Sequence, residues 1–169
     1  MTDYPIRPIA PDDRERLRAF HQRLSTESQY RRFLSIKPEL SCRDARSLVE
    51  IDGRDHFALV ATDGDAPDAP LVAVARFIRV AEGSEAAEFA IVVGDDYQRQ
   101  GVAAELMRRL AEAAVDRGVV RLRATMLSTN LPIQRLMMAI ADGPVRRREL
   151  GSLAEAEVDL AAARHRRAA

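Results

Sequence analysis

An apolar run, a short polar turn and a long amphipathic helix follow one another in the middle of the chain. The run Phe89 to Val93 leads through "GDDYQRQ" into a helical pattern from Gly101 to Arg117, and Gly118 follows as a C-terminal stop. A strand-turn-helix unit directs the unpaired N–H groups of the first helical turn at one point, together with the positive end of the helix dipole. We therefore expect this turn to bind a phosphate anion.

The remaining segments predict a sheet and further helices around this unit. "HFALVATD", "PLVAVARFIRVA" and "AAEFAIVVGD" are β-rich segments joined by turn-rich links, which favours adjacent antiparallel strands. Ser41 and Asp44 are spaced as a capping pair for a helix. The patterns predict an α/β fold of the α+β kind, with a mostly antiparallel mixed central sheet flanked by helices. Further strands are expected at 6–9, 119–127, 145–150 and 156–160, and further helices at 12–24, 27–34, 43–51 and 131–140.

Composition excludes several classes of protein. With 169 residues, 47% of them hydrophobic, the chain suits a single domain, expected over residues 1–160 with a basic surface tail at 161–169. Its 26 basic and 26 acidic residues cancel, so no overall field favours nucleic acid or a membrane surface. Cys42 is the only cysteine, and neither a signal peptide nor a spanning segment is recognisable. We expect a cytoplasmic protein.

The turn lacks both common phosphate-binding motifs, because neither a Walker loop nor three spaced glycines occur there. Its sequence "QRQGVA", Gln98 to Ala103, instead resembles the Q/R-x-x-G-x-G/A signature of the GNAT N-acetyltransferases. By pattern alone, an ordinary helix start explains these six residues equally well. A wider similarity, covering roughly residues 4–140, includes "IRPIAPDDRERLRAFHQRLSTESQYRRFL" and "EFAIVVGDDYQRQGVA". These segments resemble the GNAT domains of bacterial protein lysine acetyltransferases of the Pat type.

The resemblance implies a GNAT fold in which a splayed strand pair binds acetyl-CoA as cosubstrate. It also implies that the turn holds the pyrophosphate and that the preceding strand lies beside the pantetheine arm. Asn130 corresponds to an asparagine that contacts pantetheine in many GNATs, although capping of the next helix explains it almost as well. Met137 stands where many GNATs have a tyrosine that protonates the leaving thiolate. The cofactor-binding residues expected on this basis are Ile91, Val92, Val93, Gln98, Arg99, Gln100, Gly101, Val102, Ala103 and Asn130.

Acyl transfer to an amine requires a neutral nitrogen, and a lysine with a pKa near 10.4 is mostly protonated at neutral pH. A general base is therefore useful. Glu88 heads the apolar strand, where partial desolvation would raise its pKa, and the resemblance aligns it with the catalytic glutamate of the Pat type. The alternatives are a solvated glutamate at the strand end, or Glu85 as the base. With no nucleophile in a recognisable motif, we expect direct transfer from acetyl-CoA to the amine.

No metal site is expected, because the histidines His21, His56 and His165 lack ligand spacing. By resemblance, the acceptor is a lysine on another protein, with an acyl-CoA synthetase as the first candidate, and a homodimer is possible. Arg31, Arg32 and Glu27 on an early helix are positioned to meet charges on a protein surface, or simply to face solvent. A small amine acceptor, a non-catalytic module that senses acetyl-CoA and a structural domain are the alternatives.

Overall fold

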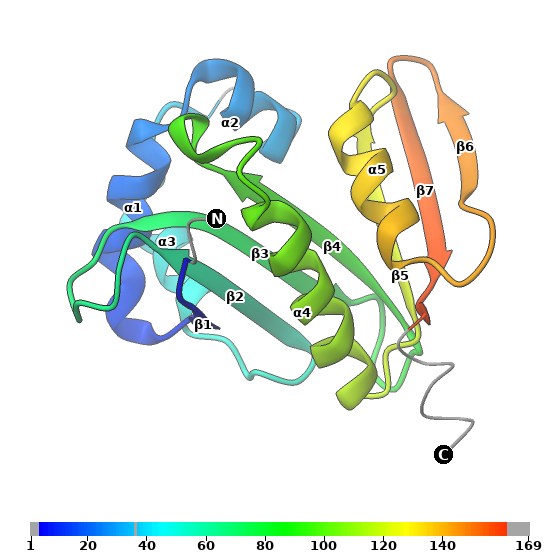
Figure 1. Ribbon diagram of the computed structural model, residues 1–169, viewed down its shortest axis with the longest axis horizontal. Helices are drawn as coiled ribbons and strands as arrows, with labels where there is room; N and C mark the ends of the chain where they lie inside the picture. Colours follow the sequence, from blue (N-terminus) through cyan, green and yellow to red (C-terminus); the bar gives the residue numbers. More distant parts are fainter. Residues whose placement is uncertain (1–3, 36, 162–169) are drawn as a thin grey trace.

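The computed structural model describes residues 4–35 and 37–161, and this part of the chain contains a seven-stranded sheet with helices on both faces (Figure 1). The strands lie in the order β1-β2-β3-β4-β5-β7-β6, and every described pair except β4–β5 is antiparallel. The strands are β1 (Ile6–Pro8), β2 (His56–Thr62), β3 (Leu71–Arg79), β4 (Ala86–Val93), β5 (Arg121–Leu127), β6 (Arg146–Leu150) and β7 (Leu153–Asp159). The helices are α1 (Arg14–Arg23), α2 (Thr26–Phe33), α3 (Cys42–Val49), α4 (Val102–Asp116) and α5 (Leu131–Ile140), with 3-10 turns at Pro11–Asp13 and Asp95–Tyr97.

The sheet opens between β4 and β5. Residues Ala86–Glu88 of β4 pair with Arg121–Arg123 of β5, and beyond this point the two strands diverge, as Figure 1 shows. On its other side β4 remains paired with β3 as far as Val93. The predicted splayed strand pair is therefore confirmed, and one edge of β4 is unpaired over its second half.

Helix α4 covers one face of the sheet because its apolar residues recur at helical spacing. Leu106, Leu110 and Ala114 are fully buried and pack against sheet residues such as Phe77 and Leu122. On the opposite face, α1 and α3 cover β2 and β3 with a second apolar cluster that includes Phe20, Leu24, Val49, Val60 and Val74. Strands β2 to β4 are therefore covered by helices on both faces of the sheet.

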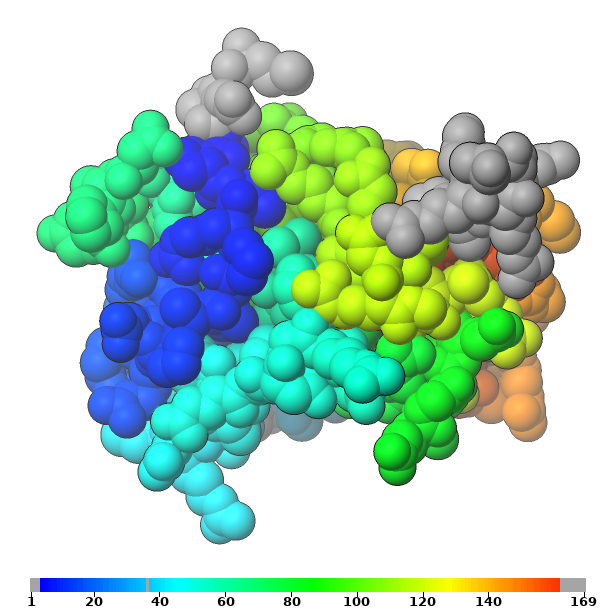
Figure 2. Space-filling view, turned by 90° about the horizontal axis from the view of Figure 1, so that it is seen from below, coloured from blue at the N-terminus to red at the C-terminus, as the bar shows by residue number. Residues whose placement is uncertain are grey.

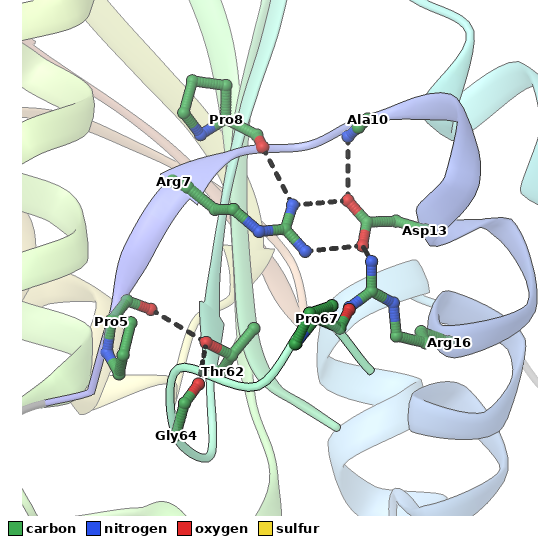
Figure 3. Close-up of polar contacts among 9 residues, drawn as sticks. All are labelled: Pro5, Arg7, Pro8, Ala10, Asp13, Arg16, Thr62, Gly64 and Pro67. Carbon is green, nitrogen blue, oxygen red and sulfur yellow. Dashed lines mark hydrogen bonds and ion pairs between the residues drawn. The ribbon is translucent and has the colours of Figure 1, made fainter. Parts of the chain in front are cut away.

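Asp13 links β1 to α1 through a buried ion cluster (Figure 3). Its fully buried carboxylate accepts hydrogen bonds from Arg7, at 2.7 and 2.8 Å, and from the Ala10 N–H at 2.8 Å. Arg16 lies 2.5 Å from the same carboxylate and also donates to the Pro67 carbonyl. Burial alone would raise the pKa of Asp13, but the hydrogen bonds from Arg7 and Ala10 outweigh burial and the pKa is lowered.

At the lower end of the molecule, the C-terminal end of α4 lies beside the loop before β2, and the loop between β3 and β4 lies on the same face (Figure 2). Arg117 donates to the Gly53 carbonyl at 2.6 Å, and its guanidinium lies 3.8 Å from the centre of the Phe57 ring. Arg79 donates to the Arg117 carbonyl at 2.7 Å and pairs with Asp55 at 2.8 Å. These contacts fix the C-terminal end of α4 at the end of the molecule opposite the turn before α4.

Candidate active site

The unpaired edge of β4 presents main-chain groups to the opening. Successive residues of a strand direct their N–H and C=O groups to alternate sides. The Gly94 N–H donates to the Val72 carbonyl of β3, and the Ala86 carbonyl accepts from the N–H of Val80, which directly follows β3. The main-chain groups of the even-numbered residues of β4 therefore face β3. Ile91 and Val93 therefore face the opening. An amide-containing chain such as pantetheine can pair with this edge as an added strand would.

The turn ends at an open helix N-terminus. Gly101 is the N-cap of α4, with a φ of 86°, and it has no side chain to cap the first N–H groups. Arg99, two residues earlier, is also left-handed, with a φ of 62°, and its side chain is exposed. A Cβ at position 101 would meet no atom within 4 Å, so space remains in front of the amides of Val102 and Ala103. The positive φ is thus a reason for glycine here that does not depend on a bound anion.

Side chains of the turn before α4 form hydrogen bonds within the turn and with residues of α2 and its N-cap. Gln98 donates to the Val93 carbonyl at 3.3 Å, and Gln100 donates to the Asp96 carbonyl at 2.8 Å. Asp95 accepts hydrogen bonds from Ser25 and Ser28 at 2.7 to 2.9 Å, so its carboxylate points toward α2. Gln98 and Gln100 therefore shape the turn, while the helix amides remain directed at the site where an anion would bind.

Glu88 lies at the point where β4 and β5 separate, on the sheet face opposite α4 and α5. Its side chain is 53% exposed, so the desolvation that its position in the sequence suggested is small in this structure. Arg123 of β5 lies 4.0 Å from the Glu88 carboxylate. Both residues line a groove of about 380 Å³ that runs over β5, β7 and β6 and also contains Glu155, Glu157 and three arginines of β6, Arg146, Arg147 and Arg148.

The remaining predicted residues lie on the other side of the opening. Asn130 is buried at the N-cap of α5, where its side chain accepts the Ile133 N–H at 3.5 Å, so the capping role is present in the structure. Met137 is fully buried in the core beneath α5. No tyrosine hydroxyl therefore occupies this position, as the sequence indicated.

Two features of the site escaped the sequence reasoning. The alternation of "RLRATML" predicts that Arg123 is exposed on one face of a strand. That Arg123 lies beside Glu88 follows only from the parallel pairing of β4 with β5, which the sequence does not reveal. The contacts of Ser25 and Ser28 with Asp95 join segments about 70 residues apart, and no local pattern predicts them.

Comparison with known proteins assigns the class. The family model for the acetyltransferase (GNAT) domain matches residues 5–140. The chain belongs to the GNAT acetyltransferase family, whose members use acetyl-CoA and act on an amine acceptor. This match confirms the predicted family, fold and enzyme class.

The relatives include proteins of the Pat type. The GNAT domain of S. lividans PAT has a TM-score of 0.81 and 30% identity, covering 93% of this chain and 90% of that one. The acetyltransferase Pat of Mycolicibacterium smegmatis is 37% identical over 156 residues, which are 92% of this chain but 45% of that protein. A cAMP-binding acyltransferase from Mycobacterium smegmatis has a TM-score of 0.64 and 32% identity, covering 93% of this chain and 43% of that one. This chain thus spans less than half the length of the last two relatives.

Other sequence expectations can be checked only within residues 4–35 and 37–161. No group of three or more potential metal ligands occurs among these residues, and His165 lies outside them. None of the described helices has the length and hydropathy of a membrane span. The basic tail expected at 161–169 falls outside the described residues from position 162 onward.

Proposed function

We propose that this chain transfers the acetyl group of acetyl-CoA directly to a lysine side chain of another protein, with Glu88 as general base. The unpaired edge of β4 that leads into the open N-terminus of α4 is the observation that carries this proposal. The edge suits the pantetheine arm, and the amides of Val102 and Ala103 suit the pyrophosphate. Gln98, Arg99, Gln100 and Gly101 would complete the turn, and Asn130 would approach the arm from α5.

In the proposed reaction the amine nitrogen attacks the thioester carbonyl carbon, Glu88 accepts a proton from the amine, and the C–S bond breaks to release the thiolate. The Ile91 N–H faces the opening and would stabilise the oxyanion as charge develops, and Val93 continues the unpaired edge. The main-chain groups of Val92, which was expected to bind the cofactor, face β3 instead. Met137 offers no proton, but a thiolate with a pKa near 8.5 leaves without one.

The groove beside Glu88 favours a protein acceptor over a small polyamine. Its three carboxylates are interspersed with four arginines, whereas a polyamine site would need an excess of acidic groups. The resemblance to Pat-type enzymes makes an acyl-CoA synthetase the first acceptor to test. The test is thiol release from acetyl-CoA with an acyl-CoA synthetase, compared with a panel of free amines. Efficient acetylation of a free amine, with no protein lysine modified above the enzyme-free background, would contradict the proposal.

A further inference from the structure

A second, smaller cavity lies beneath α1, α2 and α3, away from the opening between β4 and β5. Its volume is about 30 Å³, and most of its lining is apolar, including Phe20, Leu40 and Val74. Two guanidinium groups also line it, Arg32 from α2 and Arg76 from β3. Arg32, expected from the sequence to face a partner or solvent, is partly buried and borders this cavity, whereas the neighbouring Arg31 is exposed and pairs with Glu27.

Arg76 is 3% exposed, and its hydrogen bonds are to neutral groups. Its Nη1 donates to the Leu48 carbonyl at 3.1 Å and to His56 Nε2 at 2.9 Å. Because a guanidinium has no acceptor, His56 must accept through Nε2 and is neutral. Burial and then the charge of Arg76 lower the pKa of His56 to about 4. Neither contact supplies a negative charge.

Among residues 4–35 and 37–161, neither Arg32 nor Arg76 has a carboxylate partner, and Arg32 lies 4.7 Å from the Phe33 ring centre. Burial lowers the pKa of Arg32 to about 10, and burial together with the charge of Arg32 lowers that of Arg76 to about 9. Both remain cationic at neutral pH. The buried carboxylate of Asp13, by contrast, has arginine partners, so this pair of like charges against an apolar cavity lacks the compensation found elsewhere in the molecule.

The cavity is close to the proposed reaction centre. Arg76 is paired across the sheet with Ala90, which is two residues from Glu88 and on the same face of β4. Two residues of a strand span about 7 Å. A group bound by Arg32 and Arg76 would therefore lie within the reach of an acceptor whose amine meets Glu88.

We propose that Arg32 and Arg76 together bind a carboxylate in this cavity. A carboxylate matches the planar fork of a guanidinium and supplies the missing negative charge. The volume suits one such group rather than the body of a larger ligand. The carboxylate belongs either to the acceptor, near its reactive amine, or to a small free acid that regulates the enzyme. The first source rests on the proposed function, and the second does not.

Sodium formate is a suitable probe of the site, followed by NMR of the arginine Nε–H resonances in the whole chain. We expect a saturable change in the Arg76 resonance, weakened at least about tenfold in Arg32→Met, since hydrogen bonds to charged groups are strong. Arg31→Met, on the same helix but paired with Glu27, is the matched control and should behave as the unmodified chain does. An unsaturable change, or an equal response to sodium chloride, would overturn the site.

A set of capped heptapeptides with lysine at the central position separates the two sources of the carboxylate. Glutamate is placed in turn at each position from three before to three after the lysine, with glutamine at the same position as the control. If the acceptor supplies the carboxylate, one glutamate peptide should exceed its glutamine counterpart at least about tenfold in kcat/KM, and Arg32→Met should abolish this preference. If the glutamate and glutamine peptides have equal kcat/KM values at every position while formate binding is saturable, the site binds the carboxylate of a free acid. If no peptide or protein is acetylated, the proposed function fails while the formate titration still decides the site.

Discussion

At the scale of single residues, Glu88 combines access with a fixed position. Its backbone lies between Ile78 of β3 and Arg123 of β5, at the last point where the three strands are paired. Its side chain is half exposed, so a proton accepted there can pass to water. A base that must be regenerated in every cycle benefits from both properties.

Replacing Glu88 by glutamine should leave the affinity for acetyl-CoA near normal and reduce turnover about 100-fold or more at neutral pH, because the amide keeps the shape but cannot accept a proton. The defect should diminish as the pH rises toward the lysine pKa, where the amine deprotonates unaided. Thiol release as a function of pH measures this.

Glu85→Gln is the control for this change, since Glu85 is exposed in the link before β4 and should tolerate the substitution. A pH–rate profile of Glu88→Gln that coincides with that of the unmodified enzyme would exclude Glu88 as the base.

At the scale of elements, the turn before α4 is shaped by two left-handed residues and held by α2. The same backbone that opens the helix N-terminus makes position 101 unfavourable for any residue with a Cβ, at a cost of about 1–2 kcal/mol. A substitution there therefore affects stability as well as binding. The two effects must be separated by a pair of variants.

Gly101→Ala and Gly101→Glu share the backbone strain, but only the second adds a negative charge in front of the helix amides. We expect similar losses of Tm in both, and a loss of acetyl-CoA affinity at least about tenfold larger for Gly101→Glu, because the charge opposes the pyrophosphate. Calorimetric titration measures the affinity. Equal affinities of the two folded variants would place the pyrophosphate elsewhere.

Elements with a strong period could be predicted from the sequence, and contacts between distant segments could not. Helix α4 and the cap of α3, where Ser41 accepts the Asp44 N–H at 3.0 Å, follow from local spacing. Strand β7 begins at Leu153, earlier than the expected 156, because Gly151 and Ser152 form a tighter link to β6 than the sequence suggested. The partial burial of Arg32 beside Val74 and Val92 depends on how α2 packs on the sheet, which helical spacing alone does not determine.

At the scale of the whole molecule, the segment "IRPIAPDD", Ile6 to Asp13, which belongs to the stretch that resembles Pat-type domains, has a structural role away from the proposed reaction centre. It places Arg7 and Asp13 in the buried ion cluster that attaches α1 to the sheet. Gln29 of α2 donates to the His21 carbonyl of α1 at 3.2 Å, and Ser28 of α2 contacts Asp95 of the turn, so this attachment also supports the turn indirectly.

Arg7→Met should lower the free energy of unfolding by about 1–3 kcal/mol, because the buried Asp13 carboxylate keeps only Arg16 as a cationic partner. Arg14→Met, which removes an exposed pair with Glu15, should change it by about 0.5 kcal/mol or less. Urea denaturation compares the two. Equal effects would mean that the cluster contributes no more than a surface ion pair.

The pH dependence of the same cluster follows from the lowered pKa of Asp13. A carboxylate whose pKa is lowered by folding stabilises the fold at any pH above its pKa in the unfolded chain, which is about 4. This contribution is lost as the pH falls through the lower pKa of the folded state. The stability difference between the unmodified chain and Asp13→Asn should therefore be large at pH 7 and shrink below about pH 4. A difference that is constant with pH would contradict this assignment.

The opening between β4 and β5 should also leave a signature in amide hydrogen exchange. The Ala90 and Val92 amides point toward β3, whereas those of Ile91 and Val93 point into the opening. Exchange along β4 should therefore alternate, slow at even positions and fast at odd ones, in the protein without ligand. If acetyl-CoA pairs with this edge, it should slow exchange at Ile91 and remove the alternation, so that β4 exchanges as an interior strand does.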